Sequence, residues 1–241
     1  MGGKREPFSN FQSMWREEDS ILDWAKEKIG EEEYLLEHVE LIECFMDTVD
    51  LIRQSAPRTD YHFAICGLFM RCFDSAGRGL RAAMSGNYSG SAMYARDLLE
   101  TMFLLSYLCD DETRPIEWLK SSPDEIRQKY APAKIRSALD ERDGFLERKR
   151  EQHYKILSTL GVHPTPQSFE LRRDGTRHLN SGPFKNRHLL EECIQELAKT
   201  VLPLSGILLD YCTNFRHGKE ISSRLSLILQ RAREKYFTRE R

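Results

Sequence analysis

The residue types best suited to chemistry lie in one apolar stretch, residues 89–110, which carries a charged pair, Arg96 and Glu100. On a helix the two are one turn apart and share a face with Phe103 and Tyr107. Burial of a charge is costly unless it is paired and hydrogen-bonded, and a guanidinium makes a planar fork onto a carboxylate. Two interpretations follow: the pair is a buried strut to a neighbouring segment, or one member lines a pocket.

A second candidate is His163, which stands directly before Pro164-Thr165-Pro166. The residue before a proline is pushed out of the α region, so the histidine would be held rigidly at the end of the preceding helix. Histidine is the side chain that exchanges protons near neutral pH. It is interpreted either as a proton carrier that reaches the apolar helix or as a cap on the preceding helix.

The third candidate is a basic segment around Asp174-Gly175, a two-residue turn signal that predicts a β-hairpin. Its arginines could hold a phosphate backbone. They are equally interpreted as a solvated loop tip. The basic residues of the segment and those just beyond it are Arg172, Arg173, Arg177, Lys185, Arg187 and His188.

The sequence contains no recognisable motif for binding a metal or a cofactor. None of the seven histidines has an acidic residue three positions before it, so the di-iron Glu-x-x-His pattern is absent. The six cysteines are scattered without a CxxC or a Cys/His cluster. HExxH, GxSxG, P-loop and GxGxxG motifs are absent as well. We therefore expect no metal and no cofactor, and we expect the thiols to be reduced core residues of a cytosolic protein.

Periodic apolar residues predict the elements that would position these candidates. The fold class is all-α: a multi-helix bundle with a central apolar helix (residues 89–110) and a small β-hairpin insert at about residues 162–183. Residues 1–18 are expected to be a polar N-terminal arm, and residues 19–241 a single helical domain. The other predicted helices span residues 19–29, 31–55, 60–85, 115–120, 123–130, 132–160, 186–214 (with a kink near Pro203) and 221–236.

Composition restricts the class of protein further. The chain has 241 residues, of which 31% are charged, and a formal net charge of −2. This balance argues against a nucleic-acid footprint over the whole protein, although a local basic patch remains compatible with RNA. Since no apolar run approaches the length of a membrane span and no signal peptide is recognised, we expect a cytoplasmic protein with no membrane contact.

Four short segments form a shared pattern: A-R-D-L-L-E at residues 95–100, Tyr107-Leu108, Y-K-I-L-S at residues 154–158, and H-P-T-P at residues 163–166. This pattern resembles a family of uncharacterised bacterial helical proteins, a domain of unknown function, over about residues 88–209. The resemblance implies a shared helical fold and a cluster of Arg96, Glu100, Ser158 and His163, without an established activity.

The arrangement is also loosely similar to HEPN-type bundles of toxin and phage-defence systems. Those nucleases place an Arg four to six residues before a His on one element. Here Arg148 and His153 match that spacing, but on a charged helix whose solvated face is the simpler interpretation. The candidate Arg96 and His163 would have to come together from distant segments, which is a departure from the HEPN pattern.

These observations lead to one hypothesis and its alternatives. We expect a metal-independent ribonuclease of the toxin or defence type, in which His163 moves protons, Arg96 stabilises the developing phosphorane charge and Glu100 orients one of them. The alternatives are a non-catalytic module that binds a protein partner or forms a homodimer, and a small-molecule sensor with an apolar cavity beside Tyr107. Substrate contacts are assigned to Tyr107, Ser158, Arg172, Arg173 and Arg177.

Overall fold

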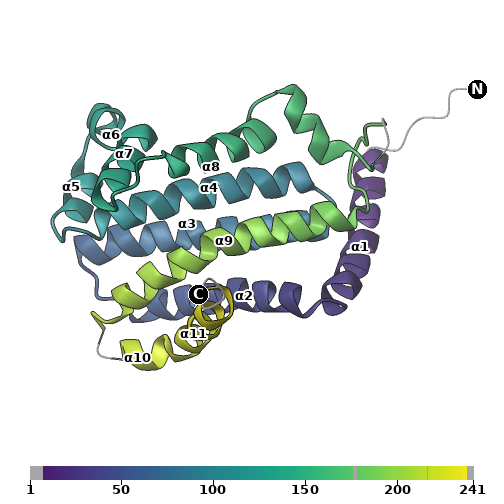
Figure 1. Cartoon of the computed structure of the whole chain (residues 1–241). Helices are drawn as coiled ribbons and strands as arrows, with labels where there is room; N and C mark the ends of the chain where they lie inside the picture. The colour runs from purple at the N-terminus through teal and green to yellow at the C-terminus, as the bar shows by residue number, and fades with distance from the viewer. Residues whose placement is uncertain (1–7, 176–177, 216, 238–241) are drawn as a thin grey trace, which may run out of the picture.

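The computed structural model describes residues 8–175, 178–215 and 217–237. Within these ranges the chain forms eleven α-helices and no strand, so the predicted all-α class is confirmed (Figure 1). None of the described helices combines the length and the apolar character that a bilayer crossing requires. All six cysteines are free thiols, and every one except Cys109 is buried.

Two antiparallel helices, α3 (Asp60–Met84) and α4 (Tyr88–Leu108), form the centre of the molecule (Figure 1). α2 (Glu33–Ser55) and α9 (Arg187–Cys212) pack against them. α4 is apolar around most of its circumference and contacts helices on several sides, as a buried central helix should. The predicted central apolar helix is therefore confirmed.

The turn between α3 and α4 depends on Gly86. Its φ is +78°, and an added Cβ would lie 2.6 Å from the carbonyl oxygen of Phe184. Only glycine tolerates both this left-handed backbone and this close approach. The turn thereby brings the segment before α9 against the start of α4.

α1 (Ser9–Gly30) lies across one end of the bundle, against α2, α3 and α9 (Figure 1). The predicted helix began at residue 19, because residues 9–18 show no apolar periodicity. In the structure they continue the same helix, with Phe11 and Trp15 exposed. Residues 1–7 of the expected arm lie outside the described residues.

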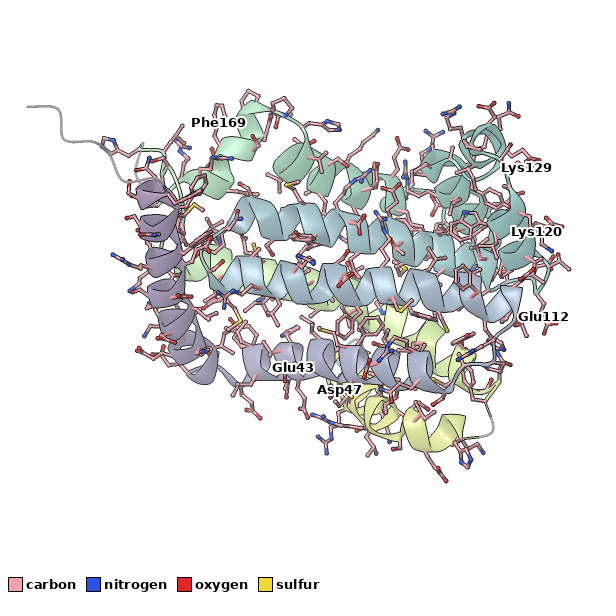
Figure 2. The ribbon with its side chains drawn as sticks, turned by 180° about the vertical axis from the view of Figure 1, so that it is seen from behind. Glu43, Asp47, Glu112, Lys120, Lys129 and Phe169 are labelled. Atoms are coloured by element: carbon pink, nitrogen blue, oxygen red, sulfur yellow. The ribbon has the colours of Figure 1, made fainter. Side chains whose placement is uncertain are left out.

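Three short helices cover the other end: α5 (Arg114–Lys120), α6 (Pro123–Lys129) and α7 (Pro132–Arg142). The Ser122 hydroxyl and the Glu125 carboxylate form a capping box at the start of α6. Figure 2 shows Lys120 and Lys129 at this end of the bundle and Phe169 at the opposite end.

The single helix predicted for residues 132–160 is wrong. α7 ends at Arg142, and Gly144 then takes a left-handed φ of +69°, a usual helix stop. α8 (Lys149–Leu157) follows and runs into a π-helical turn, η1 (Ser158–Val162). Leu146, which the predicted helix would have included, is 95% exposed in the connecting loop.

The predicted β-hairpin is not seen either. Residues 166–172, from which its first strand would start, form the 3-10 helix η2 (Pro166–Arg172), because the Thr165 hydroxyl caps it and a proline stands at its first position. Leu171 is buried against the bundle. Arg173 and Leu179 form one isolated antiparallel bridge, the extent of β-pairing in the described part of this segment.

The C-terminal elements follow the prediction more closely. α9 starts with the Asn186 side chain accepting the N–H of Leu189, and Pro203 lies inside the helix. α10 (Gly218–Ile221) and α11 (Ser223–Phe237) then pack along α2 and α9. The start predicted at residue 221 thus belongs to a short helix that precedes α11.

Candidate pocket with a buried arginine

A pocket of about 500 Å³ lies between α3, α4, α5 and α7. It contains Arg96 and Glu100, the pair singled out in the sequence. Most of its wall is apolar and aromatic, supplied by Phe63, Leu68, Phe103, Leu104, Trp118, Tyr130 and Ile135. Its charged lining consists of Arg71, Arg96, Asp97, Glu100 and Arg136.

The first charged pair of the pocket joins α3 to α4. Arg71 forms an ion pair with Asp97, whose other oxygen accepts the Ser75 hydroxyl at 2.6 Å. The hydrogen bond to Asp97 raises the pKa of Arg71. Asp97 therefore faces the neighbouring helix α3.

The second pair is Arg96 and Glu100, with 2.6 Å between Arg96 Nη2 and Glu100 Oε2. Arg96 also donates to the Tyr154 hydroxyl, and its Cζ lies 4.9 Å from the centre of the Tyr154 ring. Both members of the pair are partly buried, with side chains 25% and 31% exposed. The predicted ion pair thus exists, and it ties α4 to α8 through Tyr154.

Arg136 on α7 is the most unusual group of the pocket. It is only 8% exposed, and its Cζ lies 4.0 Å from the centre of the Tyr154 ring, so the tyrosine contacts two guanidinium groups. In the described chain no carboxylate lies within ion-pair distance of Arg136, since Asp140, one turn later, pairs with Arg150 at 2.6 Å. Two donors of Arg136, Nε and Nη1, are buried without a hydrogen-bond partner.

The charges of the pocket do not cancel. Arg71 is paired with Asp97 and Arg96 with Glu100, while Arg136 belongs to no ion pair of the described residues and acts on the Glu151 carboxylate only from beyond ion-pair distance. A buried charge without a partner is destabilising unless something binds it. The pocket therefore combines apolar walls with one unmatched positive charge.

The structure does not bring His163 into this pocket. His163 follows η1, has an exposed side chain and is not part of the pocket lining. Gly161 lies so close to α4 that an added Cβ would be 2.8 Å from the carbonyl carbon of Ala92. The loop thus docks near the start of α4, about one turn before Arg96.

The remaining predicted residues are scattered. Ser158 is buried with a hydroxyl that finds no partner, and Tyr107 lies under the Arg114 guanidinium, 4.3 Å from its Cζ; neither lines the pocket. Arg172 is exposed, and Arg173 pairs with Glu170 at 2.7 Å. Arg177 lies outside the described residues.

The sequence interpretation missed Arg71 and Arg136 in the pocket lining, and it missed Tyr154, which contacts the guanidinium groups of Arg96 and Arg136. Tyr154 belongs to the motif at residues 154–158, but nothing in the motif indicates two guanidinium partners. Arg136 sits in a charged helix with other basic residues, where a solvated position is the ordinary expectation. The one sequence signal was the apolar Ile135 directly before it. Ile135 is buried, and Arg136, the next residue, is buried beside it.

A second hollow of about 590 Å³ lies between α2, α9 and α11. Its polar side chains include Lys199, which pairs with Glu196 at 3.3 Å, and Glu40, which pairs with Arg224 at 3.7 Å. No lining residue of this hollow carries a buried side-chain atom without a partner. It therefore lacks the feature that distinguishes the pocket at Arg136.

The described residues contain no group of three or more His, Cys, Asp or Glu side chains that could hold a metal ion. Comparisons of the chain with models of known families, with curated proteins and with solved structures give no match. The function is therefore argued from the geometry of the pocket.

Proposed function

We propose that this protein is a helical module that binds a small molecule in the pocket between α3, α4, α5 and α7. The observation that carries the proposal is the meeting of apolar walls with convergent charged groups in a volume of about 500 Å³. Small-molecule sites are typically concave, mostly apolar, and furnished with a few placed polar groups. The module would serve as a sensor or carrier of its ligand.

Gly67 offers a way to close the pocket without disturbing the core. It lines the pocket on α3, and an added Cβ meets no atom within 4 Å. Gly67→Leu should fill part of the pocket, whereas Gly67→Ala adds one methyl group. Both changes should stabilise the helix by about 0.5–1 kcal/mol, because glycine is a poor helix former.

The test uses N-phenyl-1-naphthylamine, an uncharged probe whose fluorescence rises in apolar surroundings. The wild type and Gly67→Ala should bind it with similar affinity, and Gly67→Leu should bind it about tenfold more weakly. The melting temperatures of both variants show whether they are folded. Absence of binding to the wild type, or equal binding by Gly67→Leu, would refute the proposal.

The ribonuclease hypothesis stays a prediction. It requires His163 to act together with Arg96 and Glu100. The two charged residues form an ion pair in the pocket, while His163 is exposed outside its lining. Its test is therefore kept separate from the test of ligand binding.

A further inference from the structure

The geometry points to the class of ligand: a monoanion with an apolar body, such as a carboxylate on a hydrocarbon or aryl group, whose head binds at Arg136. This inference rests on the proposed function, because it names what the same pocket binds. It is carried by three observations on the pocket: its donors, its charge and its walls.

The donors indicate an acceptor ligand. Four buried polar atoms of the pocket lining have no hydrogen-bond partner: three are guanidinium nitrogens that can only donate (Nε and Nη1 of Arg136 and Nε of Arg96), and the fourth is the acceptor Glu100 Oε2. The Glu100 carboxylate is already engaged, since its Oε2 lies in an ion pair 2.6 Å from Arg96 Nη2. A carboxylate would accept from the Arg136 guanidinium through charge-assisted hydrogen bonds, which are stronger than those between neutral groups.

The charge indicates a single negative charge on the ligand. The pairs Arg71–Asp97 and Arg96–Glu100 are each neutral in sum, and Arg136 adds one positive charge. A monoanion would neutralise the pocket, whereas a dianion would leave a buried negative charge facing Asp97 and Glu100. Burial of unmatched charge is unfavourable in either sense.

The walls indicate an apolar body. Leu68, Phe103, Leu104 and Ile135 supply hydrocarbon surface next to the guanidinium groups. Phe63, on the rim, is 71% exposed, although a large aromatic side chain gains stability from burial. A ligand that extends from Arg136 towards α5 would cover this surface.

Tyr154 explains why Arg136 stays in place without an ion pair. Its ring lies against the Arg136 guanidinium, and its hydroxyl accepts from Arg96. A cation–π contact orients the arginine without using a hydrogen bond of its N–H groups. The two guanidinium groups are thus held by one ring while donors remain unused.

Decanoate, decan-1-ol and decyl phosphate test the inference by titration calorimetry, because they share one chain and differ in head group. Decanoate should bind the wild type most tightly. Arg136→Met should weaken the affinity for decanoate by about 30- to 100-fold and change the affinity for decan-1-ol by less than threefold. Arg136→Lys should recover part of the loss, since lysine keeps the charge but not the fork.

Arg114→Met is the matched control. Arg114 also lies over a tyrosine ring, Tyr107, but it is not part of the pocket lining. Its replacement should leave decanoate binding unchanged. The uncharged naphthylamine probe should bind Arg136→Met as well as the wild type, which shows that the pocket of the variant is intact.

The outcomes separate the two claims. If the uncharged probe binds but decanoate gains nothing over decan-1-ol, the pocket stands and the monoanion inference is overturned. Tighter binding of decyl phosphate, or of an RNA oligonucleotide in competition with decanoate, overturns it as well. If neither the probe nor any of the three chains binds, the proposed function itself fails.

Discussion

The two ends of the bundle treat their basic groups in opposite ways. At the end covered by α5 and α7, which carries Lys120 in Figure 2, a buried arginine has donors without partners. At the end covered by η2, which carries Phe169, the described basic residues are exposed or paired. The buried Tyr88 hydroxyl there accepts the N–H of Asn186 at 3.0 Å and lies within 3.1 Å of the carbonyl oxygens of Phe184 and Asn186.

The difference teaches that charge density along a sequence is a poor guide to a site. The described part of the basic segment near Asp174 has more positive residues than the pocket, but these residues are exposed or paired with acidic side chains. One buried guanidinium without an ion-pair partner has a larger free-energy cost than several exposed or paired arginines. A buried charge without a partner is therefore a better indication of a site than a run of exposed charges.

The largest effect is expected at the satisfied end. Tyr88 is 1% exposed, so Tyr88→Ala should lower the free energy of unfolding by about 3–5 kcal/mol through the lost packing. Tyr88→Phe keeps the ring and should lower it by about 1–3 kcal/mol, because the N–H of Asn186 loses its partner. Urea unfolding measures both. Equal stability of Tyr88→Phe and wild type would mean that the hydroxyl contributes nothing.

At the unsatisfied end the sign should reverse. Arg136→Met should raise the free energy of unfolding by about 1–3 kcal/mol, since it removes a buried charge that has no partner. Arg150→Met is the contrasting variant: Arg150 pairs with Asp140 at 2.6 Å, and its loss should lower stability by a similar amount. Destabilisation by both variants would show that Arg136 is a structural residue.

A smaller effect is expected at Glu196, an acidic group between the two ends that is paired with His153. Burial acts to raise the pKa of Glu196, but the His153 hydrogen bond and the charges of His153 and Lys199 together lower it below its usual 4.5. A carboxyl with a lowered pKa stabilises the fold above its unfolded pKa, and this contribution is lost as the pH falls through the folded value.

Melting temperatures between pH 7 and pH 3 test this contrast. Wild type should lose more stability than Glu196→Gln as the pH falls below about 4.5, because the variant has no carboxyl to titrate. Asp23→Asn is a suitable control, since Asp23 lies in an exposed pair with Lys26 on α1. Parallel pH profiles of wild type and Glu196→Gln would contradict the stabilising role of the His153 pair.

The smallest change in stability is expected for His163→Ala. The side chain is exposed, so its removal should alter the free energy of unfolding by less than about 0.5 kcal/mol. The same variant tests the ribonuclease hypothesis when growth and total RNA integrity are followed after induced expression in bacteria. Growth arrest and RNA cleavage by the wild type alone would support it. Harmless expression of both at equal soluble levels would remove most of its support.

Helix starts were predictable where a local signal was sufficient. The side chains of Thr59, Ser122 and Asn186 each cap a helix at a position that the sequence indicates. The break after Arg142 was not predictable from periodicity. A segment that is polar on all sides has no apolar stripe, so its sequence does not distinguish a helix from a loop. The hairpin failed for a related reason: the Thr165 cap and Pro166 outweigh the turn signal at Asp174-Gly175.

The site divides in the same way. Arg96 and Glu100 could be paired from the sequence because they are one turn apart on one helix. Arg136 and Tyr154 belong to other helices, and their distance from Arg96 depends on how α7 and α8 pack on α4. Sequence spacing contains no information on that packing, so the unmatched charge of the pocket became visible only in the folded chain.

The loop between α7 and α8 has a consequence for engineering. It joins the helix of Arg136 to the helix of Tyr154, and the Asp143–Arg150 ion pair fastens its base. Exposed loops accept inserted domains. A circularly permuted fluorescent protein inserted beside Leu146 would sit next to the two elements that hold the guanidinium groups. Its emission would then report occupancy of the pocket, which would make this chain the scaffold of a genetically encoded indicator.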